Sequence, residues 1–250
     1  MSVLVIAGFD SSGDAGVLRD CAVLAELGLT ARVAVTAVTA QGAMGVTALH
    51  PVPPAVVAAQ IAAAGPVRAI KSGMLANAGI VRAVARALPC GIPFVLDPVL
   101  AASSGAELLD VAGRAALLQH LLARATLITP NLPEAAKLTG LPEEMGDDSR
   151  NATAAALIAM GAQAVLLKGG HADGPWATDW LHRPGQPPLA FTAPRLPHDK
   201  RGTGCTLATA LTVALASGAD LPEACAFARE LLQRWLGEGS ERRTRPSSAR

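Results

Sequence analysis

The sequence predicts an α/β protein with a mostly parallel sheet covered by helices on both faces. Short runs rich in Val and Ile alternate with longer stretches rich in Ala and Leu, the pattern of alternating strands and helices. The strand-like runs are apolar throughout, which is typical of strands buried on both faces. Near the end, two strand-like runs flank the turn-like segment Arg183–Gln186, which indicates an antiparallel hairpin at the edge of the sheet.

Each element follows from this alternation. Pro53 and Pro133 stand near the start of helical stretches, where a missing N–H costs little. The predicted strands are Val3–Ala7, Arg32–Val38, Gly45–His50, Ala69–Ser72, Pro93–Asp97, Leu127–Thr129, Ala164–Lys168, and the hairpin strands Trp176–His182 and Pro188–Ala193. The predicted helices are Asp14–Leu27, Pro53–Ala64, Ala78–Leu88, Ala112–Ala123, Pro133–Leu138, Ala152–Met160, Thr203–Ala216 and Leu221–Leu236.

Composition bounds the organisation of the chain. It has 250 residues, 51% of them apolar, with a net charge of +1 and 3% aromatic residues. These values argue against disorder and against a nucleic-acid stacking surface, and no apolar window is long enough to cross a membrane. We expect one domain over residues 1–237, because no linker interrupts it, and a flexible basic tail over 238–250.

The cysteines and the first residues indicate a compartment. Cys21, Cys90, Cys205 and Cys225 lack metal-type spacing, so we expect buried free thiols in a reducing environment. The first ten residues carry no basic segment, which argues against a secretory signal. Both observations predict a cytoplasmic protein.

Two Gly-rich segments follow the predicted strands or begin a helix. Ala7–Gly16 comes directly after the first strand, with Asp20 one helical turn later; it matches neither GxGxxG nor a Walker A motif, and an ordinary strand–helix turn is the alternative. Lys200–Leu207 opens an Ala-rich helix, where free N–H groups suit an anion. Cys205 lies in that first turn, where the pKa of a thiol can fall; the alternative is a small buried hydrophobe.

Three polar residues or pairs stand at other strand ends. Asn131 and Glu134 share one helix face and suit hydrated Mg²⁺ with phosphates, although Asn131 can also serve only as a helix cap. Lys168 follows a strand and can neutralise a phosphate, or simply be solvated. Asp97 ends another strand. Because carboxyl ends of parallel strands gather ligands, these groups together predict phosphoryl transfer from a nucleotide.

These segments resemble the ribokinase-like superfamily, and most closely the hydroxymethylpyrimidine/phosphomethylpyrimidine kinases of thiamine synthesis. Singly the motifs are weak, but all seven occur in order between about Val3 and Leu236. The matching segments are Ala7–Gly16, Thr36–Gln41, Ser72–Leu75, Leu96–Val99, Thr129–Ala135, Lys168–His171 and Gly202–Leu207. The resemblance implies the three-layer ribokinase-like fold. It also implies an ATP- and Mg²⁺-dependent kinase that phosphorylates 4-amino-5-hydroxymethyl-2-methylpyrimidine and then its monophosphate.

The resemblance also implies roles for single residues. The pyrimidine site would comprise Gly8, Asp20, Gln41 and Met74. Without the resemblance, Met74 would be interpreted as a core residue and Gln41 as a loop residue bonded to the backbone. Cys205 stands where many relatives have an Asp base, and the Gly202, Thr203 and Gly204 amides would hold the transferred phosphoryl group. Asn131, Glu134 and Asp97 would serve Mg²⁺, with Asn131 acting through water, and Lys168, Asn131 and Thr203 would contact the nucleotide phosphates.

Some positions depart from the family pattern. Asp14 replaces a Gly, residues 101–105 lack a Lys that usually follows Asp97-Pro98-Val99, and Arg201 replaces a common His. The charge of Asp14 would repel a phosphorylated substrate unless a cation intervenes. We therefore hypothesise that Arg19 or Arg201 compensates for the missing Lys.

Other functions compete with this one. A pyridoxal or pyridoxine kinase of the same superfamily would also phosphorylate a hydroxymethyl group on a small ring. A non-catalytic pyrimidine-binding protein would release no ADP, and a sugar kinase would expect an acidic base in place of Cys205. No nucleic-acid or membrane partner is expected. The resemblance also allows a homodimer, with Gly45–His50 as a candidate contact.

Overall fold

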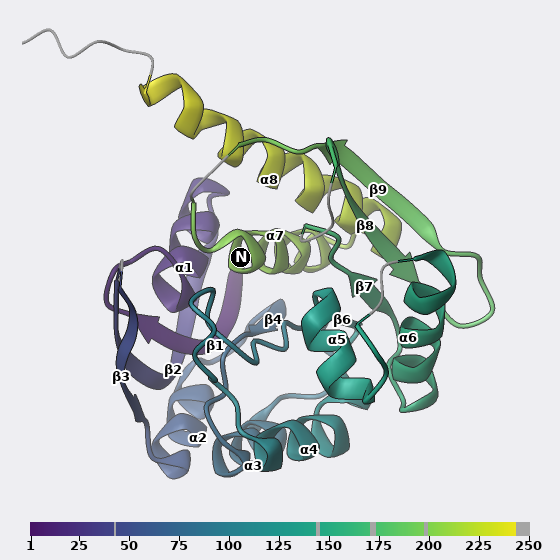
Figure 1. Cartoon of the computed structure of the whole chain (residues 1–250). Coiled ribbons are helices and arrows are strands. Elements are labelled where there is room, and N and C mark those ends of the chain that lie inside the picture. The colour runs from purple at the N-terminus through teal and green to yellow at the C-terminus, as the bar shows by residue number, and fades with distance from the viewer. Residues whose placement is uncertain (43, 144–145, 171–173, 198–199, 244–250) are drawn as a thin grey trace, which may run out of the picture.

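In the computed structural model, one nine-stranded sheet forms the centre of the described residues, which are 1–42, 44–143, 146–170, 174–197 and 200–243 (Figure 1). The strand order is β3-β2-β1-β4-β5-β6-β7-β8-β9. The strands are β1 Ser2–Asp10, β2 Thr30–Gly42, β3 Gly45–Pro51, β4 Ala69–Ser72, β5 Phe94–Leu96, β6 Leu127–Ile128, β7 Val165–Leu167, β8 Trp176–His182 and β9 Leu189–Pro194. Strands β2 to β7 of this order run parallel, whereas β3, β8 and β9 join by antiparallel pairing.

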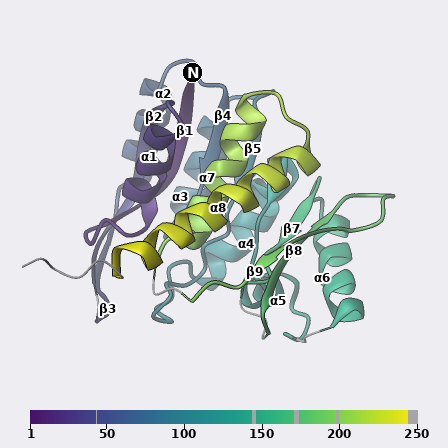
Figure 2. The same cartoon turned by 90° about the horizontal axis from the view of Figure 1, so that it is seen from above.

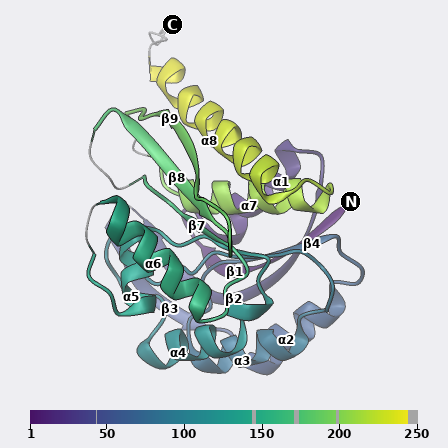
Figure 3. The ribbon, with the colours of Figure 1, turned by 90° about the vertical axis from the view of Figure 1, so that its right-hand side faces the viewer.

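Helices cover both faces of the sheet, as the sequence predicts (Figures 2 and 3). The helices α1, α7 and α8 lie on one face, and α2 to α6 lie on the other. Their bounds are α1 Gly16–Glu26, α2 Pro54–Ala63, α3 Ala78–Ala87, α4 Val111–His120, α5 Leu132–Thr139, α6 Asp147–Ala159, α7 Thr203–Ala216 and α8 Leu221–Arg243, with a 3₁₀ turn at Leu122–Arg124.

Alternation along the central strands builds the two cores. On β1, Leu4 and Ile6 pack with α2 and α3, whereas Val3 and Val5 pack with α1. All four side chains are at most 1% exposed, so burying both faces explains why these runs are apolar throughout. The three-layer ribokinase-like fold is confirmed.

Both edges of the sheet are antiparallel. The predicted hairpin is present as β8 and β9, and β3 adds a second antiparallel edge beside β2. β2 is longer than predicted and reaches Gly42, with a register shift against β3 at Ala40/Gln41. This extension carries Gln41 beyond the layer of helices.

Three sequence predictions need correction. Helix α6 begins at Asp147, because Asp147 and Asp148 supply a favourable acidic first turn that the apolar pattern does not reveal. Helix α8 continues to Arg243, beyond the predicted end at Leu236 and into the predicted tail, of which residues 244–250 lie outside the described part. All four cysteines are free, but Cys90 is exposed and Cys225 alone among them is buried.

A buried ion pair crosses the interface between the sheet and its helices. Lys71 of β4 donates to Asp20 of α1 at 2.8 Å, and neither side chain is exposed. Thr209 of α7 donates to the other Asp20 oxygen at 2.8 Å. Lys71 lies on the face of β4 toward α1 and α7, since its neighbour Ile70 packs on the opposite side. The pair thus joins three elements through one carboxylate.

Removing both members of this pair should cost less stability than the sum of the two single removals. We expect Lys71→Met or Asp20→Asn to lower the free energy of unfolding by about 3 kcal/mol each, because each leaves a buried charge uncompensated. The double variant should cost clearly less than the sum. Urea denaturation measures all three, with Glu26→Gln as a control, because its pair with Arg19 is half exposed. A double variant that costs the full sum would contradict the coupling.

Candidate active site

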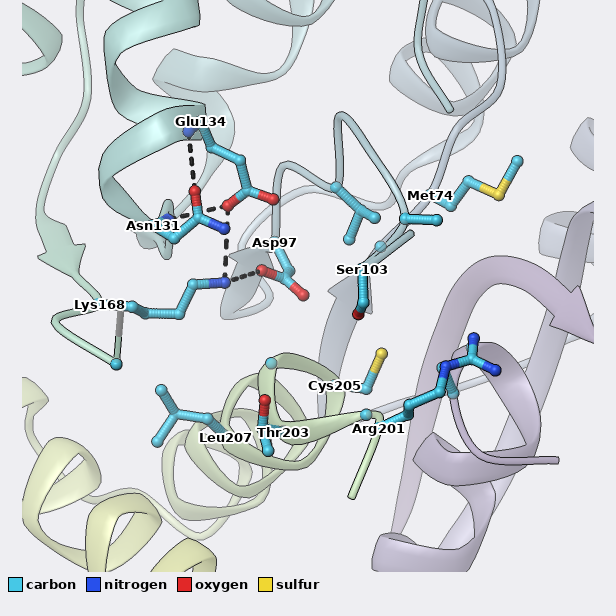
Figure 4. A pocket seen from close by; sticks show the side chains of 18 of the residues that line it. Met74, Asp97, Ser103, Asn131, Glu134, Lys168, Arg201, Thr203, Cys205 and Leu207 are labelled. Atoms are coloured by element: carbon cyan, nitrogen blue, oxygen red, sulfur yellow. Dashed lines mark hydrogen bonds and ion pairs between the residues drawn. The ribbon is translucent and has the colours of Figure 1, made fainter. Parts of the chain in front are cut away.

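A cavity of about 610 Å³ opens where the parallel strands end, at their carboxyl edge (Figure 4). All predicted site residues except Asp20 line it, although they come from segments far apart in the chain. These lining residues are Gly8, Gln41, Met74, Asp97, Asn131, Glu134, Lys168, Gly202, Thr203, Gly204 and Cys205. His171, the last residue of one matching segment, lies outside the described residues.

Two glycines allow close backbone contacts at the mouth of the cavity, one within the segment between β1 and α1 and one between this segment and the start of α7. A Cβ on Gly16, which has φ +59°, would lie 2.2 Å from the Gly8 carbonyl oxygen. A Cβ on Gly202, with φ +80°, would lie 2.2 Å from the Asp14 carbonyl oxygen. Only glycine tolerates both the positive φ and this approach. The contact of Gly16 with Gly8 closes the turn between β1 and α1, whereas the contact of Gly202 with Asp14 joins this turn to the start of α7.

The start of α7 is built to receive an anion. Gly202 is its N-cap residue and makes no side-chain capping bond, so the first N–H groups of the helix lack that partner. The helix is buried from Thr206 to Ala216, which fixes its direction. Arg19 steadies the first turn from behind by donating to the Thr206 hydroxyl at 2.9 Å. A rigid helix start thus presents its N–H groups and positive dipole end to the cavity.

Lys168 stands beside this helix start. Its Nζ lies 3.5 Å from where a Cβ on Gly204 would sit. It bonds to Asp97 at 2.8 Å and lies 3.7 Å from Glu134. These carboxylates raise the pKa of Lys168 above its usual value, against the opposing effect of burial, so the ammonium keeps its charge. The solvated-lysine alternative is wrong, because the side chain is only 13% exposed.

Asn131 and Glu134 form a capping box at the start of α5. The Asn131 side-chain oxygen accepts from the Glu134 backbone N–H, and the Glu134 carboxylate accepts from the Asn131 backbone N–H, both at 2.8 Å. Burial, the largest effect, raises the pKa of Glu134, and Lys168 opposes it. The Asn131 oxygen accepts one bond in the cap, so its second lone pair and its amide N–H₂ remain for a ligand.

The opposite wall of the cavity is apolar and narrow. A Cβ on Gly8 would lie 2.7 Å from the Met74 sulfur, so Gly8 makes room for Met74 against the cavity. Met74 is 7% exposed and belongs to a small apolar cluster with Ala37 and Leu108. Gln41 lines the cavity from the part of β2 that extends past β1 and pairs with β3. This wall offers flat apolar contact and one amide, which suits a small polar ring.

Comparison with known proteins supplies the deciding observation. A model of the family described as phosphomethylpyrimidine kinase matches residues 10–245. The chain is 45% identical to a hydroxymethylpyrimidine/phosphomethylpyrimidine kinase of Mycobacterium tuberculosis over 94% of this chain and 86% of that protein. The chain belongs to the phosphomethylpyrimidine kinase family. It is therefore a phosphotransferase, as the sequence predicted.

Solved structures agree with this assignment. The kinase resembles a phosphomethylpyrimidine kinase from Clostridium difficile with TM-score 0.78 and 32% identity, over 96% of this chain and 99% of that one. It resembles the pyridoxal kinase from Staphylococcus aureus in complex with pyridoxal with TM-score 0.86 and 31% identity, over 94% and 87%. The same Staphylococcus aureus enzyme in complex with AMP-PCP gives TM-score 0.84 and 34% identity, over the same shares.

The thiol of Cys205 differs from the expectation. Burial raises its pKa to about 11, although Lys71 and a Gly16 backbone hydrogen bond lower it. The nearby Asp20 and Asp97 carboxylates add to the rise. The start of α7 does not overcome these effects, so the kinase holds a protonated thiol at neutral pH. The buried-hydrophobe alternative is also wrong, because Cys205 is partly exposed and points into the cavity.

Asp20 lies beneath the cavity and does not line it. Its carboxylate is fully buried and bonds to Lys71 and Thr209, which corrects its predicted place in the pyrimidine wall. Lys71 itself lines the cavity, and sequence reasoning missed it. A lysine inside a strand predicted to be wholly buried was the available signal, because such a charge requires a partner.

Arg201, and not Arg19, reaches the cavity. Arg201 lies 3.2 Å from Asp10 and 4.0 Å from Asp14, and it lines the opening. Arg19 is buried against Thr206 and the ring of Trp235, 4.3 Å from the ring centroid. Of the two cations hypothesised to compensate for the missing Lys, the structure leaves Arg201.

The contact of Gly202 with Asp14 generates a prediction. Gly202→Ala should lower kcat about 100-fold, the cost of losing one well-placed anion donor, because the new Cβ displaces the start of α7. Gly218→Ala is the matched control. It has φ +92° at the other end of α7 with nothing within 4 Å, so it carries the same backbone strain away from the cavity. Steady-state ADP release measures both, and equal losses would contradict the explanation.

Proposed function

We propose that the kinase transfers the γ-phosphoryl group of ATP to the hydroxymethyl oxygen of 4-amino-5-hydroxymethyl-2-methylpyrimidine, and then to the resulting monophosphate. The diphosphate would serve thiamine assembly. One observation carries the proposal: a single cavity joins the start of α7 and Lys168 to the apolar wall around Met74, with Cys205 pointing into it. The cavity therefore has a region for the phosphates and a region for the substrate ring, with the Cys205 thiol between them.

The start of α7 and Lys168 support the transfer electrostatically. The backbone N–H groups of α7 and the ammonium of Lys168 border the space next to Cys205. In the proposed reaction, charge develops there on the transferring phosphoryl group. Both are held before substrate arrives, since α7 is buried and Lys168 is fixed by two carboxylates. Preorganised donors stabilise the transition state without rearranging.

Asp97 and Glu134 fit a magnesium ion. Mg²⁺ is typically held by one or two carboxylates together with substrate phosphates and water, and these two carboxylates are the oxygen donors beside Lys168. Asp97 Oδ2 lies 3.8 Å from where a Cβ on Gly204 would sit, so it faces the phosphate site. Within the described residues no group of three His, Cys, Asp or Glu side chains could hold a metal, so the phosphates would complete the shell. The ion supplies charge neutralisation to the phosphates when bound.

Cys205 is the group placed to handle the hydroxymethyl proton. Its thiolate accepts that proton as the oxygen–phosphorus bond forms and the bond to the ADP oxygen breaks. At neutral pH the thiolate is a small fraction, because the pKa lies near 11. The same sulfur as a thiol hydrogen-bonds and orients the hydroxymethyl oxygen.

Pyridoxal is the second candidate substrate. The fold match to a pyridoxal kinase at TM-score 0.86 favours it, and pyridoxal also carries a hydroxymethyl group on a ring. Among the described residues Phe9 is the only aromatic side chain lining the cavity. Recognition of either ring would therefore depend on Gln41 and apolar contact rather than on aromatic stacking. No described helix is long and apolar enough to cross a membrane.

A product assay tests the proposal. Purified protein is incubated with ATP, Mg²⁺ and equal amounts of hydroxymethylpyrimidine and pyridoxal, and phosphorus NMR identifies the products. We expect pyrimidine monophosphate and diphosphate. Pyridoxal phosphate as the main product would favour the second candidate. A reaction that stops at pyrimidine monophosphate would exclude the second step, and the absence of ADP release with either alcohol would contradict a kinase of this class.

Arg201 should separate the two steps. Asp10 and Asp14 lie near the opening and would repel a monophosphate, whereas Arg201 beside them attracts it. We expect Arg201→Met to lower kcat/KM for the monophosphate ten- to hundredfold, the usual worth of a charged hydrogen bond, and to change it less than threefold for the alcohol. Arg114→Gln, which removes a cation paired with Glu107 outside the cavity, is the control. Equal losses on both substrates would contradict this role.

A further inference from the structure

Lys71 is an unusual residue for its place in the fold. It lies in a central strand, between β1 and β5, with a side chain that is 0% exposed to solvent. The residues paired with it on those strands are Val5 and Val95, which are buried in the apolar cores on the same face. Hydrophobic packing alone would favour another apolar residue at this position.

Stability does not account for the Lys71–Asp20 pair. Two charges taken out of water lose about as much as their attraction returns, so a well-packed apolar pair is often equally stable. Thr209 adds one hydrogen bond to Asp20, but this only satisfies a carboxylate that the lysine required. The pair therefore calls for a role beyond holding β4, α1 and α7 together.

The pair is turned toward the cavity through its ammonium. Both Asp20 oxygens accept bonds within the protein, from Lys71 and Thr209. Lys71 has three N–H bonds, and Asp20 takes one. Its Nζ lies 3.0 Å from where a Cβ on Gly73 would sit, and both residues line the cavity. Because Gly73 has no side chain, the buried ammonium packs directly behind the backbone of the wall of the cavity that also holds Cys205.

The charges facing Cys205 come from four elements. Asp20 on α1 and Asp97 after β5 are negative, whereas Lys71 on β4 and Lys168 after β7 are positive. Lys168 already bonds to Asp97 and lies near Glu134. Lys71 exerts the largest favourable effect on the thiolate, ahead of the Gly16 backbone hydrogen bond. Geometry also relates Lys71 to this thiol. Thr209 lies one helical turn after Cys205, on the same face of α7. Its hydroxyl bonds to Asp20, to which Lys71 also bonds.

We propose that Lys71 is a positioning residue for Cys205. The fixed positive charge of Lys71, held on the face of α7 that carries Cys205, stabilises the thiolate that accepts the hydroxymethyl proton. The inference rests on the proposed function. In this step the sulfur gains the proton as the substrate oxygen bonds to phosphorus and ADP leaves, and the thiol later returns the proton to solvent. Lys71 keeps its own proton throughout, because Asp20 and Asp97 raise its pKa above the usual value.

The test measures the titration of Cys205 without any substrate. Iodoacetamide reacts with the thiolate, and peptide mass spectrometry follows alkylation at Cys205 separately from Cys21 and Cys90, which are also accessible. We expect Lys71→Met to slow alkylation at fixed pH by about tenfold, which corresponds to a rise of one pKa unit. Asp20→Asn should accelerate it, because it removes a negative charge and leaves the ammonium.

A purely structural role of the ion pair cannot change the alkylation rate in opposite directions in Lys71→Met and Asp20→Asn. Both substitutions break the same buried ion pair, so loosening of the fold would raise the reactivity of Cys205 in both. Lys71→Arg keeps the charge and should retain an alkylation rate near that of the wild type. Thr209→Val removes a hydrogen bond to Asp20 without changing a charge, so it measures the effect of loosening the network alone. The inference is overturned if the alkylation rate of Cys205 changes in the same direction in Lys71→Met and Asp20→Asn, or if it is unchanged in Lys71→Met.

A further variant covers loss of folding. If Lys71→Met does not fold by circular dichroism, the neutral double variant Lys71→Met/Asp20→Asn replaces it. Its alkylation rate should lie below the wild-type rate, because Lys71 affects the sulfur more than Asp20 does; a rate at or above wild type would overturn the inference. In active variants, loss of Lys71 should lower kcat with little change in KM for ATP. Since alkylation needs no turnover, its outcome is independent of whether the proposed substrate is correct.

Discussion

The active site depends on a backbone contact that only glycine permits. Gly16 touches the Gly8 carbonyl and Gly202 touches the Asp14 carbonyl, each at a distance that a side chain would forbid. The first contact closes the loop after the first strand, and the second fixes this loop against the start of α7, although about 190 residues separate them in sequence. The ring wall at Gly8 and the anion site at α7 are therefore one rigid unit, which is what phosphoryl transfer requires, because catalysis there is mostly positioning and electrostatics.

Charge in this kinase is local and matched. The chain carries a net charge of +1, so no general field draws ATP to it. Six cationic side chains of the described residues line the cavity. Four of them form ion pairs with carboxylates: Lys168 with Asp97, Lys71 with Asp20, Arg201 with Asp10 and Arg229 with Asp179. Such pairs hold each cation in place before a phosphate arrives. These pairs also avoid the large free-energy cost of burying an unpaired charge in a mostly apolar interior.

The sequence predicts the layers of the fold because burial on both faces leaves a simple apolar pattern. It predicts α7 and β4 to the residue, since Gly202 and the charge pattern mark their ends. It places the start of α6 too late, because an acidic first turn carries no apolar signal. The motifs contain just over half of the residues that line the cavity, and they do not show which way a side chain points. Asp20 follows a motif and yet faces Lys71 below the cavity, and the pKa of Cys205 depends on burial that only the packed structure reveals.

Two departures from the family pattern explain each other once the structure is known. By the family resemblance of the sequence, Asp14 adds a negative charge in place of a Gly and Arg201 adds a positive charge in place of a His. The two side chains lie 4.0 Å apart, and Arg201 also reaches Asp10. The added carboxylate therefore meets an added cation at the same opening, and the local charge is conserved while its geometry changes. An imidazole is partly neutral at physiological pH, whereas a guanidinium is always charged. The substitution of Arg for His thus gives this opening a permanent cation, which allows it to accept a second carboxylate without repelling an anionic substrate.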